Sequence, residues 1–534
     1  MTLPRYPNMD VPDRVSEGLD FAVVVSLTET PQSPRTVVQQ GEVAPDGALI
    51  ARLPDRHAWK VDVVLSAYDF VIRDGANSQS IALLPRGDST PAVFHLRARP
   101  TTKPLEMRPI MATLWHEGAY IGRIGRSIQV GRRSQALHGA QDEVQQGTSS
   151  SRWAQSGPIA VDAAQEQPDL TLFLTSQATA PDLQMVTVSP YLRPPTVSTV
   201  RTPGDLRSWL ESHYETFARS SSRGVTSVDG APRASGPLVT AQLQGFGREL
   251  YRRYAPQDFK NAFWRLRDQL GDRFRSIQIF TDDPLVPWEL MRPFRDAEEA
   301  DFLGIEFQIA RWHVGGPSQL ERPPRVVRVS ELAVISPTYS APRDALPAQD
   351  IELERLRRVP GYRAVPAGFH GLSRLAASPP EGIVHFAGHS IVRLSPQGIA
   401  EYALILEDAQ VDLMAWRGLM AKSLPSHPFF FFNSCHLGGA LRIADFVEGW
   451  GPALLDVGAS GYIGGLWPLG DAGAAEFARR FYDQLDPAFL TRPVLVSEIL
   501  RRARLGFYER ADPTFLAYVL YGDPFLSLAR GGTR

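Results

Sequence analysis

Hydrophobic and polar positions divide the chain into two regions that differ in periodicity. Between about residues 20 and 130, short segments rich in β-branched and aromatic residues alternate with turn residues, as in DFAVVVSL (20–27) and KVDVVLSAYDFVI (60–72). The piece WHEGAY predicts a hairpin turn at Glu117-Gly118. Strands that follow one another without a helical repeat between them are typical of a β-sandwich.

From about residue 276 the pattern changes to strands that alternate with amphipathic helices. Near-continuous apolar runs at 276–280, 331–337, 382–389 and 428–434 predict buried strands. Helical repeats separate and follow these runs, for example in ELERLRRV, IADFVEGWGPALLDVG and DAGAAEFARRFYDQL. The C-terminal 200 or so residues therefore predict an α/β domain whose mostly parallel sheet is covered by helices on both faces.

A pair of helices is predicted just before this region. Apolar residues recur at helical spacing through 238–270, and the Ala255-Pro256 break divides the segment, because proline begins a helix better than it continues one. Two polar stretches, 136–168 and 220–237, lack periodicity and predict a linker and a loop, respectively. Whether the loop is a processing site stays open.

The composition is that of a globular protein of several domains. The chain has 534 residues, of which 43% are hydrophobic and 21% charged. Its formal net charge of -2 gives no global field toward nucleic acid or an anionic membrane, so neither partner is expected. No segment approaches the ~18 uninterrupted apolar residues of a membrane span, and the N-terminus carries no apolar leader, so a cytoplasmic location is expected.

The single cysteine, Cys435, is the first candidate for chemistry. It cannot form an internal disulfide or a Cys-rich zinc site. The four phenylalanines before it predict a buried strand, and the change to polar and flexible residues from Asn433 onward places Cys435 at the end of that strand. A free cysteine there is either a small buried hydrophobe or a nucleophile, and local sequence leaves both interpretations open.

His389 is the second candidate, because it ends another predicted strand, IVHFAGH. Catalytic groups in open parallel sheets gather at the carboxyl ends of the strands, and a thiol with a nearby imidazole suits nucleophilic catalysis. A metal site at His385 and His389 is disfavoured, since four strand residues span roughly 13 Å at ~3.3 Å each. We expect no metal and no cofactor, and we expect His385 to pack or hydrogen-bond within the sheet.

Over about residues 243–529 the sequence resembles the CHAT-domain family of caspase-like cysteine proteases, which are related to caspases and separases. The motifs that carry the resemblance occur in the family's order and are GFGRELYRRYAP, PLVPWELM (284–291), FLGIEFQIAR (302–311), ISPTYS, HFAGHS, YALILED, NSCHLGG, GASGYIGGLWPLGD (458–471) and YGDP (521–524). Single motifs such as PWEL are weak, but the ordered set is specific.

The chain is expected to divide as follows, with the part before the CHAT region taken from the residue pattern and the CHAT region from the resemblance. It consists of an N-terminal tail (1–19), a β-sandwich-like binding domain (20–135), a linker (136–168), a pseudo-caspase-like subdomain that begins the CHAT region (169–325) and a caspase-like catalytic domain (326–534).

The resemblance also implies roles for particular residues. His389 matches the family's catalytic base or acid and Cys435 its nucleophile, while the backbone N–H groups of Cys435 and Ser390 match the oxyanion hole. The position of Ser390 is commonly glycine in the family, and a serine would be strained there if the turn required positive φ. Asp408, Asp445 and Trp467 are candidates for a substrate pocket, and the preferred P1 side chain stays open.

The function implied is that of a cysteine endopeptidase that cleaves a dedicated protein substrate as a bacterial defence or regulated cell-death effector. Co-encoded proteins are the candidates for that substrate, and a partner or signal bound by the N-terminal β domain would activate the enzyme. The alternatives are a catalytically inactive CHAT-like scaffold and a thiol acyltransferase with the same dyad. The acyltransferase lacks support because GYIGG is expected within a strand and does not open a helix.

Overall fold

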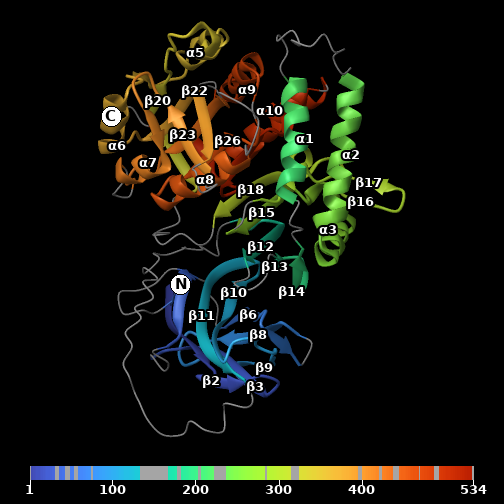
Figure 1. Ribbon diagram of the computed structural model, residues 1–534. Coiled ribbons are helices and arrows are strands. Elements are labelled where there is room, and N and C mark those ends of the chain that lie inside the picture. The colour runs from blue at the N-terminus through green and yellow to red at the C-terminus, as the bar shows by residue number, and fades with distance from the viewer. Residues whose placement is uncertain are drawn as a thin grey trace. The chain divides into compact units, whose positions relative to one another are not determined.

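The computed structural model describes residues 2–30, 35–41, 49–52, 58–73, 76–132, 166–176, 182–201, 206–221, 236–282, 285–313, 324–394, 400–419, 424–436, 444–467, 469–485, 492–510 and 512–531 (Figure 1). The chain divides into two compact units. Unit 1 comprises Met1–Val200 with Pro256–Gln269 and Gly316–Arg322, and unit 2 comprises the remainder. The linker predicted at 136–168 lies almost wholly outside the described residues, as do most of 220–237.

Unit 1 begins with two β-sheets. The first has the strand order β5 (Leu49–Arg52), β1 (Thr2–Asp10), β3 (Asp20–Thr28), β9 (Ala92–Ala98) and β7 (Phe70–Ile72). The second has the order β2 (Arg14–Ser16), β11 (Ala119–Gly131), β10 (Leu105–His116), β6 (Trp59–Ser66) and β8 (Ser78–Leu83), with β4 (Val37–Gly41) also paired to β11. Buried side chains from both sheets form one hydrophobic cluster, so the all-β N-terminal region is confirmed.

Residues 1–19, predicted to be a tail, belong largely to these sheets. Strand β1 pairs with both β3 and β5, and β2 pairs in parallel with β11. The alternation of β1 was hidden because Arg5 and Pro7 occupy buried positions beside Met9. Nη2 of Arg5 donates there to the carbonyl oxygens of Leu84 and Pro85 at 3.0 Å each.

The predicted hairpin turn joins β10 and β11. Glu117 and Gly118 both have positive φ, 50° and 87°, which is the backbone of a tight two-residue turn. Three further antiparallel strands follow in unit 1: β12 (Leu170–Ser176), β13 (Leu183–Ser189) and β14 (Leu192–Val200).

The predicted helix pair is present as α2 (Gly236–Tyr254) and α3 (Gln257–Leu270), which are separated at Ala255-Pro256. A further helix, α1 (Leu206–Ser221), was not predicted. Its buried residues recur at helical spacing, and they are Leu206, Leu210, Tyr214 and Phe217. None of the described helices is long and apolar enough to cross a membrane.

The main sheet of unit 2 is mixed. Its strands run in the order β15 (Ser276–Thr281), β18 (Gln308–His313), β28 (Tyr518–Gly522), β26 (Gly461–Gly465), β25 (Phe429–His436), β22 (Gly382–Leu394), β20 (Glu331–Ile335) and β21 (Tyr362–Val365). The pairs from β26 through β21 are parallel, whereas β28 runs antiparallel to β26. Strands β23 (Ala400–Ile405) and β24 (Gln410–Asp412) add an antiparallel extension to β22.

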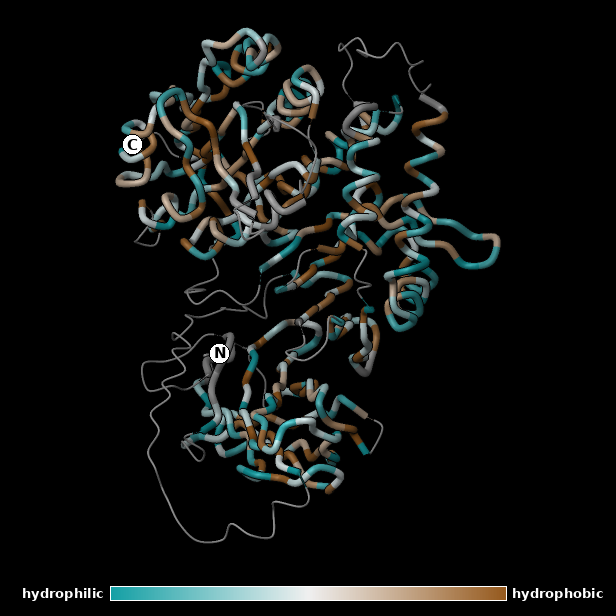
Figure 2. Tube along the Cα trace, viewed as in Figure 1, coloured by the Kyte–Doolittle hydropathy of each residue, from teal (hydrophilic) through white to brown (hydrophobic). Residues whose placement is uncertain are grey.

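Helices cover both faces of this sheet, as predicted. On one face, Phe431 packs against Phe481 and Tyr482 of α9. On the other, Phe430 and Phe432 pack against Trp416 of α7 and Trp450 of α8, respectively. The helices of unit 2 after α2 are α4 (Leu303–Glu306), α5 (Gln349–Leu356), α6 (Phe369–Ala377), α7 (Leu413–Leu419), α8 (Ala444–Asp456), α9 (Asp471–Asp483) and α10 (Val496–Tyr508). Figure 2 shows hydrophobic residues along the central strands.

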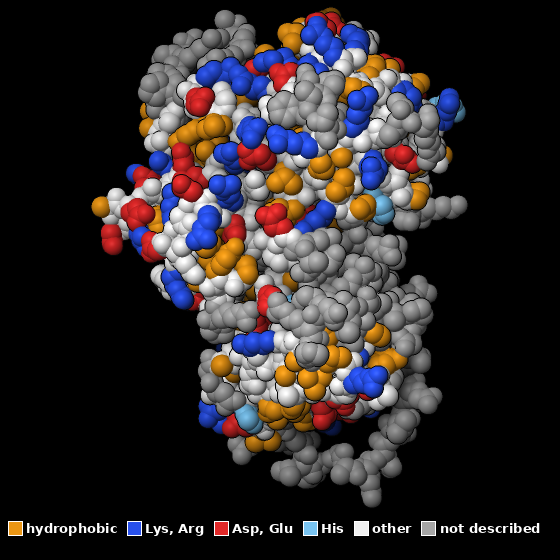
Figure 3. Space-filling view, turned by 180° about the vertical axis from the view of Figure 1, so that it is seen from behind, with side chains coloured by type: hydrophobic (Ala, Val, Ile, Leu, Met, Phe, Trp, Pro, Cys, Tyr) orange, Lys and Arg blue, Asp and Glu red, His pale blue; other side chains and the backbone are white. Residues whose placement is uncertain are grey.

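Short elements complete unit 2. They are the hairpin β16 (Phe294–Arg295) and β17 (Glu298–Glu299), the small sheet β19 (Val326–Val329), β29 (Ser527–Arg530) and β27 (Val494–Leu495), and the 3-10 helices η1 (Gly271–Arg273), η2 (Trp288–Leu290), η3 (Pro342–Asp344) and η4 (Pro513–Leu516). On the face seen in Figure 3, basic and acidic side chains are interspersed, in keeping with the small net charge.

Candidate active site

The two candidate catalytic residues lie on neighbouring parallel strands. In the register of β22 and β25, His389 is directly opposite Cys435, and Ser390 is opposite His436. Strand β25 ends at His436, so Cys435 is its penultimate residue. The apolar residues from Phe429 to Phe432 are all buried and anchor β25 in the centre of the sheet. The strand continues through Asn433 and Ser434 to Cys435 and His436.

The imidazole of His389 is held in one orientation. The side chain is 5% exposed, and its Nε2 lies 2.8 Å from the backbone carbonyl oxygen of Asp344. A carbonyl oxygen only accepts hydrogen bonds, so Nε2 carries the hydrogen. In the neutral ring, Nδ1 therefore carries the free lone pair. Nδ1 is the nitrogen that can accept a proton.

Tyr339 contacts both the backbone and the ring of His389. Its hydroxyl accepts the N–H of His389 at 2.7 Å and donates to the carbonyl oxygen of Ile405 at 3.0 Å. The two ring centroids are 4.6 Å apart. A Cβ on Gly388 would lie 2.7 Å from this hydroxyl, which explains the glycine before His389. Sequence reasoning missed Tyr339, although ISPTYS follows β20 at the same end of the sheet.

A buried polar cluster joins the two strands beneath the candidate dyad. The Glu352 carboxylate of α5 lies 2.7 Å from Nε2 of His385 on β22 and accepts the side-chain amide of Asn433 on β25 at 2.8 Å. Nδ1 of His385 lies 3.0 Å from the Tyr482 hydroxyl, and the Asn433 amide oxygen accepts the Tyr518 hydroxyl at 2.5 Å. His385 is thus hydrogen-bonded in the interior as expected, with partners on the covering helices.

Ser390 occupies an extended strand position. It is buried, it is not among the described residues with positive φ, and it pairs with Leu404 of β23 as well as with His436 of β25. The conformation therefore does not require glycine. Because strands flank Ser390 on both sides, its N–H points along the sheet toward one of them.

The three residues predicted for a substrate pocket lie in different surroundings. The exposed Asp408 carboxylate accepts the N–H of Phe369, the first residue of α6, at 2.8 Å. Trp467 is buried and packs against Tyr214 of α1, at 5.3 Å between ring centroids. It therefore lies in the core of unit 2. Asp445 belongs to α8, and its side chain lies outside the described part of the chain.

Asp471, the first residue of α9, is electrostatically linked to His389. Its carboxylate accepts the N–H of Ala348 at 2.7 Å. Burial raises the pKa of Asp471 above its ordinary value, and the charge of Glu352 raises it further. The hydrogen bond from Ala348 and the charge of His389 lower this pKa but do not cancel the rise. Asp471 thereby ties α9 to the loop that supplies the Asp344 carbonyl group.

His385 and His389 both lie within strand β22, where residues four positions apart are too distant to bind one metal ion. Within the described ranges, no group of three or more His, Cys, Asp or Glu side chains could hold a metal ion.

The CHAT-domain family model matches residues 244–522, more than half of the chain. The chain belongs to the CHAT-domain family. The resemblance inferred from the ordered motifs is thus confirmed, with limits close to the predicted 243–529. No curated protein matches the sequence.

The solved structures similar to this CHAT-domain protein include three distant matches. The separase–securin complex of Saccharomyces cerevisiae matches 67% of this chain and 30% of the other at 11% identity, with a TM-score of 0.38. A cohesin module of a Clostridium perfringens glycoside hydrolase matches 24% of this chain and 98% of its own at 10% identity, with a TM-score of 0.15. The CARDB domain of a Pyrococcus furiosus protein matches 24% of this chain and 94% of its own at 15% identity, with a TM-score of 0.14. The chain thus spans less than a third of the separase that it matches.

Proposed function

We propose that this CHAT-domain protein is a caspase-like cysteine endopeptidase that uses Cys435 as nucleophile and His389 as general base and acid. The observation that carries the proposal is the register of β22 and β25, which sets His389 opposite Cys435 at the end of β25. Neighbouring positions in a parallel pair share a face of the sheet, and a thiol needs its base within reach in space.

In the proposed mechanism, Nδ1 of His389 takes the proton of the Cys435 thiol, and the thiolate attacks the carbonyl carbon of the scissile peptide bond. His389 then gives that proton to the leaving amine as the peptide bond breaks and the acyl-enzyme forms. Water, deprotonated by His389, hydrolyses the thioester and restores the thiol. The hydrogen bond from Nε2 to the Asp344 carbonyl supports this role, because it stabilises the ring while Nδ1 is protonated.

The oxyanion hole in this proposal consists of the backbone N–H groups of Cys435 and Ser390. Removal of one such donor typically costs about 3 to 4 kcal/mol of transition-state stabilisation. Since Ser390 has strand partners on both sides, its N–H becomes available only when the strand pair that binds it opens. We therefore propose that substrate binding opens this pair.

The substrate in this proposal is a dedicated protein, and the N-terminal β-sandwich is the module that receives an activating partner or signal. A role as an effector of bacterial defence or regulated cell death follows the family resemblance alone. Cleavage of neighbouring gene products, with and without each candidate activator, would identify the substrate.

The dyad is tested by labelling the full-length chain with a set of peptidyl acyloxymethyl ketones that differ at P1. We expect mass spectrometry to place the adduct on Cys435, and we expect Cys435→Ala and His389→Ala each to abolish it. His370→Ala removes an exposed histidine of α6 and is the matched control, which should label as the wild type does. Labelling that survives His389→Ala would overturn the dyad.

A further inference from the structure

A cavity of about 1070 Å³ opens on unit 2 beside β20 and β21, and none of His389, Ser390 and Cys435 lines it. Glu331, the first residue of β20, and Glu381, which directly precedes β22, both line it. His389 lies seven positions into β22, toward the other end of the strand. The cavity is therefore separate from the proposed catalytic site, and its volume is of the size that holds bound ligands.

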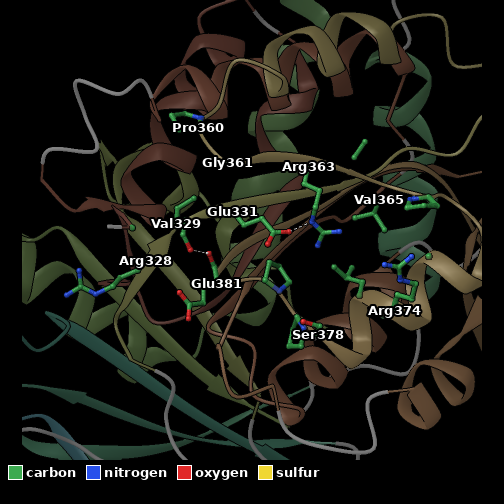
Figure 4. A pocket seen from close by; sticks show the side chains of 18 of the residues that line it. Arg328, Val329, Glu331, Pro360, Gly361, Arg363, Val365, Arg374, Ser378 and Glu381 are labelled. Carbon is green, nitrogen blue, oxygen red and sulfur yellow. Dashed lines mark hydrogen bonds and ion pairs between the residues drawn. The ribbon is translucent and has the colours of Figure 1, made fainter. Parts of the chain in front are cut away.

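Positive charge dominates the lining of this basic cavity. Four arginines face two glutamates, and Arg363 pairs with Glu331 (Figure 4). The other three, Arg328, Arg374 and Arg530, make no hydrogen bond or ion pair through their side chains with any residue that the structure describes. Figure 4 places Arg328 and Arg374 on opposite sides of the cavity. Such separated cations suit a ligand that carries several anionic groups along its length.

The cavity also reaches an open edge of the main sheet. Strand β21 is the last strand in the described sheet and pairs only with β20. Three consecutive residues of β21, Arg363 to Val365, line the cavity together with Pro366. Side chains alternate between the two faces of a strand, so contact with consecutive residues fits a cavity that follows the strand's edge. Unpaired N–H and C=O groups on such an edge can accept another extended chain.

The wall beside this edge is rigid. The N–H groups of Ser330 and Glu331 both donate to the carbonyl oxygen of Glu381, at 3.1 Å each, and Leu332 N–H donates to Gly361 at 2.9 Å. Gly361 has φ of +80°, and a Cβ there would lie 2.2 Å from the Ser330 carbonyl oxygen, so only glycine allows this close approach. A wall bonded in this way is preformed and loses little conformational freedom on binding.

We propose that the basic cavity binds a short acidic peptide segment of a partner protein, which pairs with β21 as an added strand while its carboxylates contact Arg328, Arg374 and Arg530. No aromatic side chain lines the described cavity, so it offers no stacking surface for a nucleobase. The aliphatic lining, which includes Val365 and Leu375, fits the apolar side chains that alternate with acidic ones in a strand. This site does not depend on the dyad.

The test uses fluorescence anisotropy of a short labelled peptide of alternating Glu and Val with the full-length protein at low ionic strength. We expect saturable binding, and we expect Arg374→Gln and Arg328→Gln each to weaken it by about three- to tenfold, as for partly exposed charge-assisted pairs. Arg273→Gln removes an exposed arginine of unit 2 that does not line the cavity and should change nothing. The corresponding Lys-Val peptide should not bind.

Two further probes separate strand addition from simple anion capture. N-methylation of alternate residues of the Glu-Val peptide removes backbone donors without altering its charge, and we expect it to abolish binding. Equal binding of the methylated peptide would overturn strand addition. Equal binding by all arginine variants would overturn the site, and arginine-dependent binding of inorganic tripolyphosphate with no binding of the peptide would reassign it to a small anion.

Discussion

His389 is fixed by two contacts from the connection between β20 and α5. Tyr339 follows β20 and bonds the His389 N–H, while the Asp344 carbonyl bonds Nε2. Each contact restricts a different degree of freedom, the backbone in one case and the ring in the other. The orientation of the ring is therefore set before a substrate binds.

Tyr339→Phe tests the contribution of the hydroxyl group. The variant loses one accepted and one donated hydrogen bond, so we expect the free energy of unfolding to fall by about 1 to 3 kcal/mol. Looser positioning of His389 should slow electrophile labelling of Cys435 severalfold. Tyr191→Phe, on an exposed tyrosine of unit 1, should leave the labelling rate unchanged. Unaltered labelling in Tyr339→Phe would show that this hydroxyl does not position His389.

Ser390→Gly tests whether this strand position needs the flexibility of glycine. Because the φ of Ser390 is not positive, glycine relieves no strain there and should lower the free energy of unfolding by roughly 0.5 to 1 kcal/mol. We expect no gain in the rate of Cys435 labelling. A clear gain would mean that the active conformation of Ser390 differs from the extended one.

The sequence marked His389 and Cys435 as candidates because each ends an apolar run that reads as a buried strand. The prediction that the strand ends at His389 is wrong, since β22 continues to Leu394, where it pairs with β23. Tyr339, Glu352 and Asn433 could not be assigned their roles, since their partners lie 50, 33 and 81 positions away along the chain. Asp408 was a pocket candidate because it lies near a predicted strand end. The spacing of residues in the sequence does not show where a side chain points. In the structure, Asp408 bonds the start of α6 and Trp467 lies in the core.

Glu352 connects one helix, α5, to two strands, β22 and β25. Its carboxylate on α5 contacts both His385 of β22 and Asn433 of β25, so one side chain ties together the two strands that carry the candidate dyad. All three side chains are buried, which makes an unpaired member costly.

Glu352→Ala leaves His385 and Asn433 without this acceptor, and we expect urea unfolding of unit 2 to show a loss of about 2 to 4 kcal/mol. Cys435 labelling should slow as the two strands lose their common anchor. Glu354→Ala, on an exposed position of the same helix, is the matched control and should stay within about 0.5 kcal/mol of wild type. Equal effects of both substitutions would argue against the anchoring role.

Strands and helices were predicted best where the apolar pattern was unbroken. Strand β1 was not predicted because a buried arginine and a buried proline interrupt its alternation of polar and apolar residues. The carbonyl oxygens that accept from Arg5 come close to it only in the folded chain. Helix α1 carries a readable stripe of buried residues from Leu206 to Phe217 and could have been predicted from its spacing alone.

At the scale of the whole molecule, the stability of unit 2 should depend on pH through Asp456, the last residue of α8. Burial raises the pKa of this carboxyl from 3.8 to about 6, although the charge of Arg417 opposes the shift. A carboxyl with a raised pKa contributes its full stability below about pH 4. That contribution is lost as the pH rises through about 6.

Asp456→Asn removes this loss. We expect the variant to be more stable than wild type at pH 8 by up to about 3 kcal/mol, because each tenfold change in proton affinity corresponds to ~1.4 kcal/mol. The difference should vanish near pH 4, and urea unfolding at both pH values provides the measurement. Asp350→Asn, at an exposed position of α5, controls for the lost charge. If Asp456→Asn is no more stable at pH 8 than wild type, the claim that ionisation of Asp456 destabilises unit 2 is wrong.

Cys435 is the single cysteine of the sequence, so any thiol reactivity of the chain belongs to it and reports on the proposed dyad. The measurement is the rate of alkylation by iodoacetamide against pH, for wild type and for His389→Ala. If His389 takes the proton of the thiol, the rate in the wild type should rise at a pH well below the ordinary cysteine value of ~8.5. His389→Ala should move that rise back toward ~8.5, while His370→Ala leaves it in place. Identical profiles for wild type and His389→Ala would contradict the dyad.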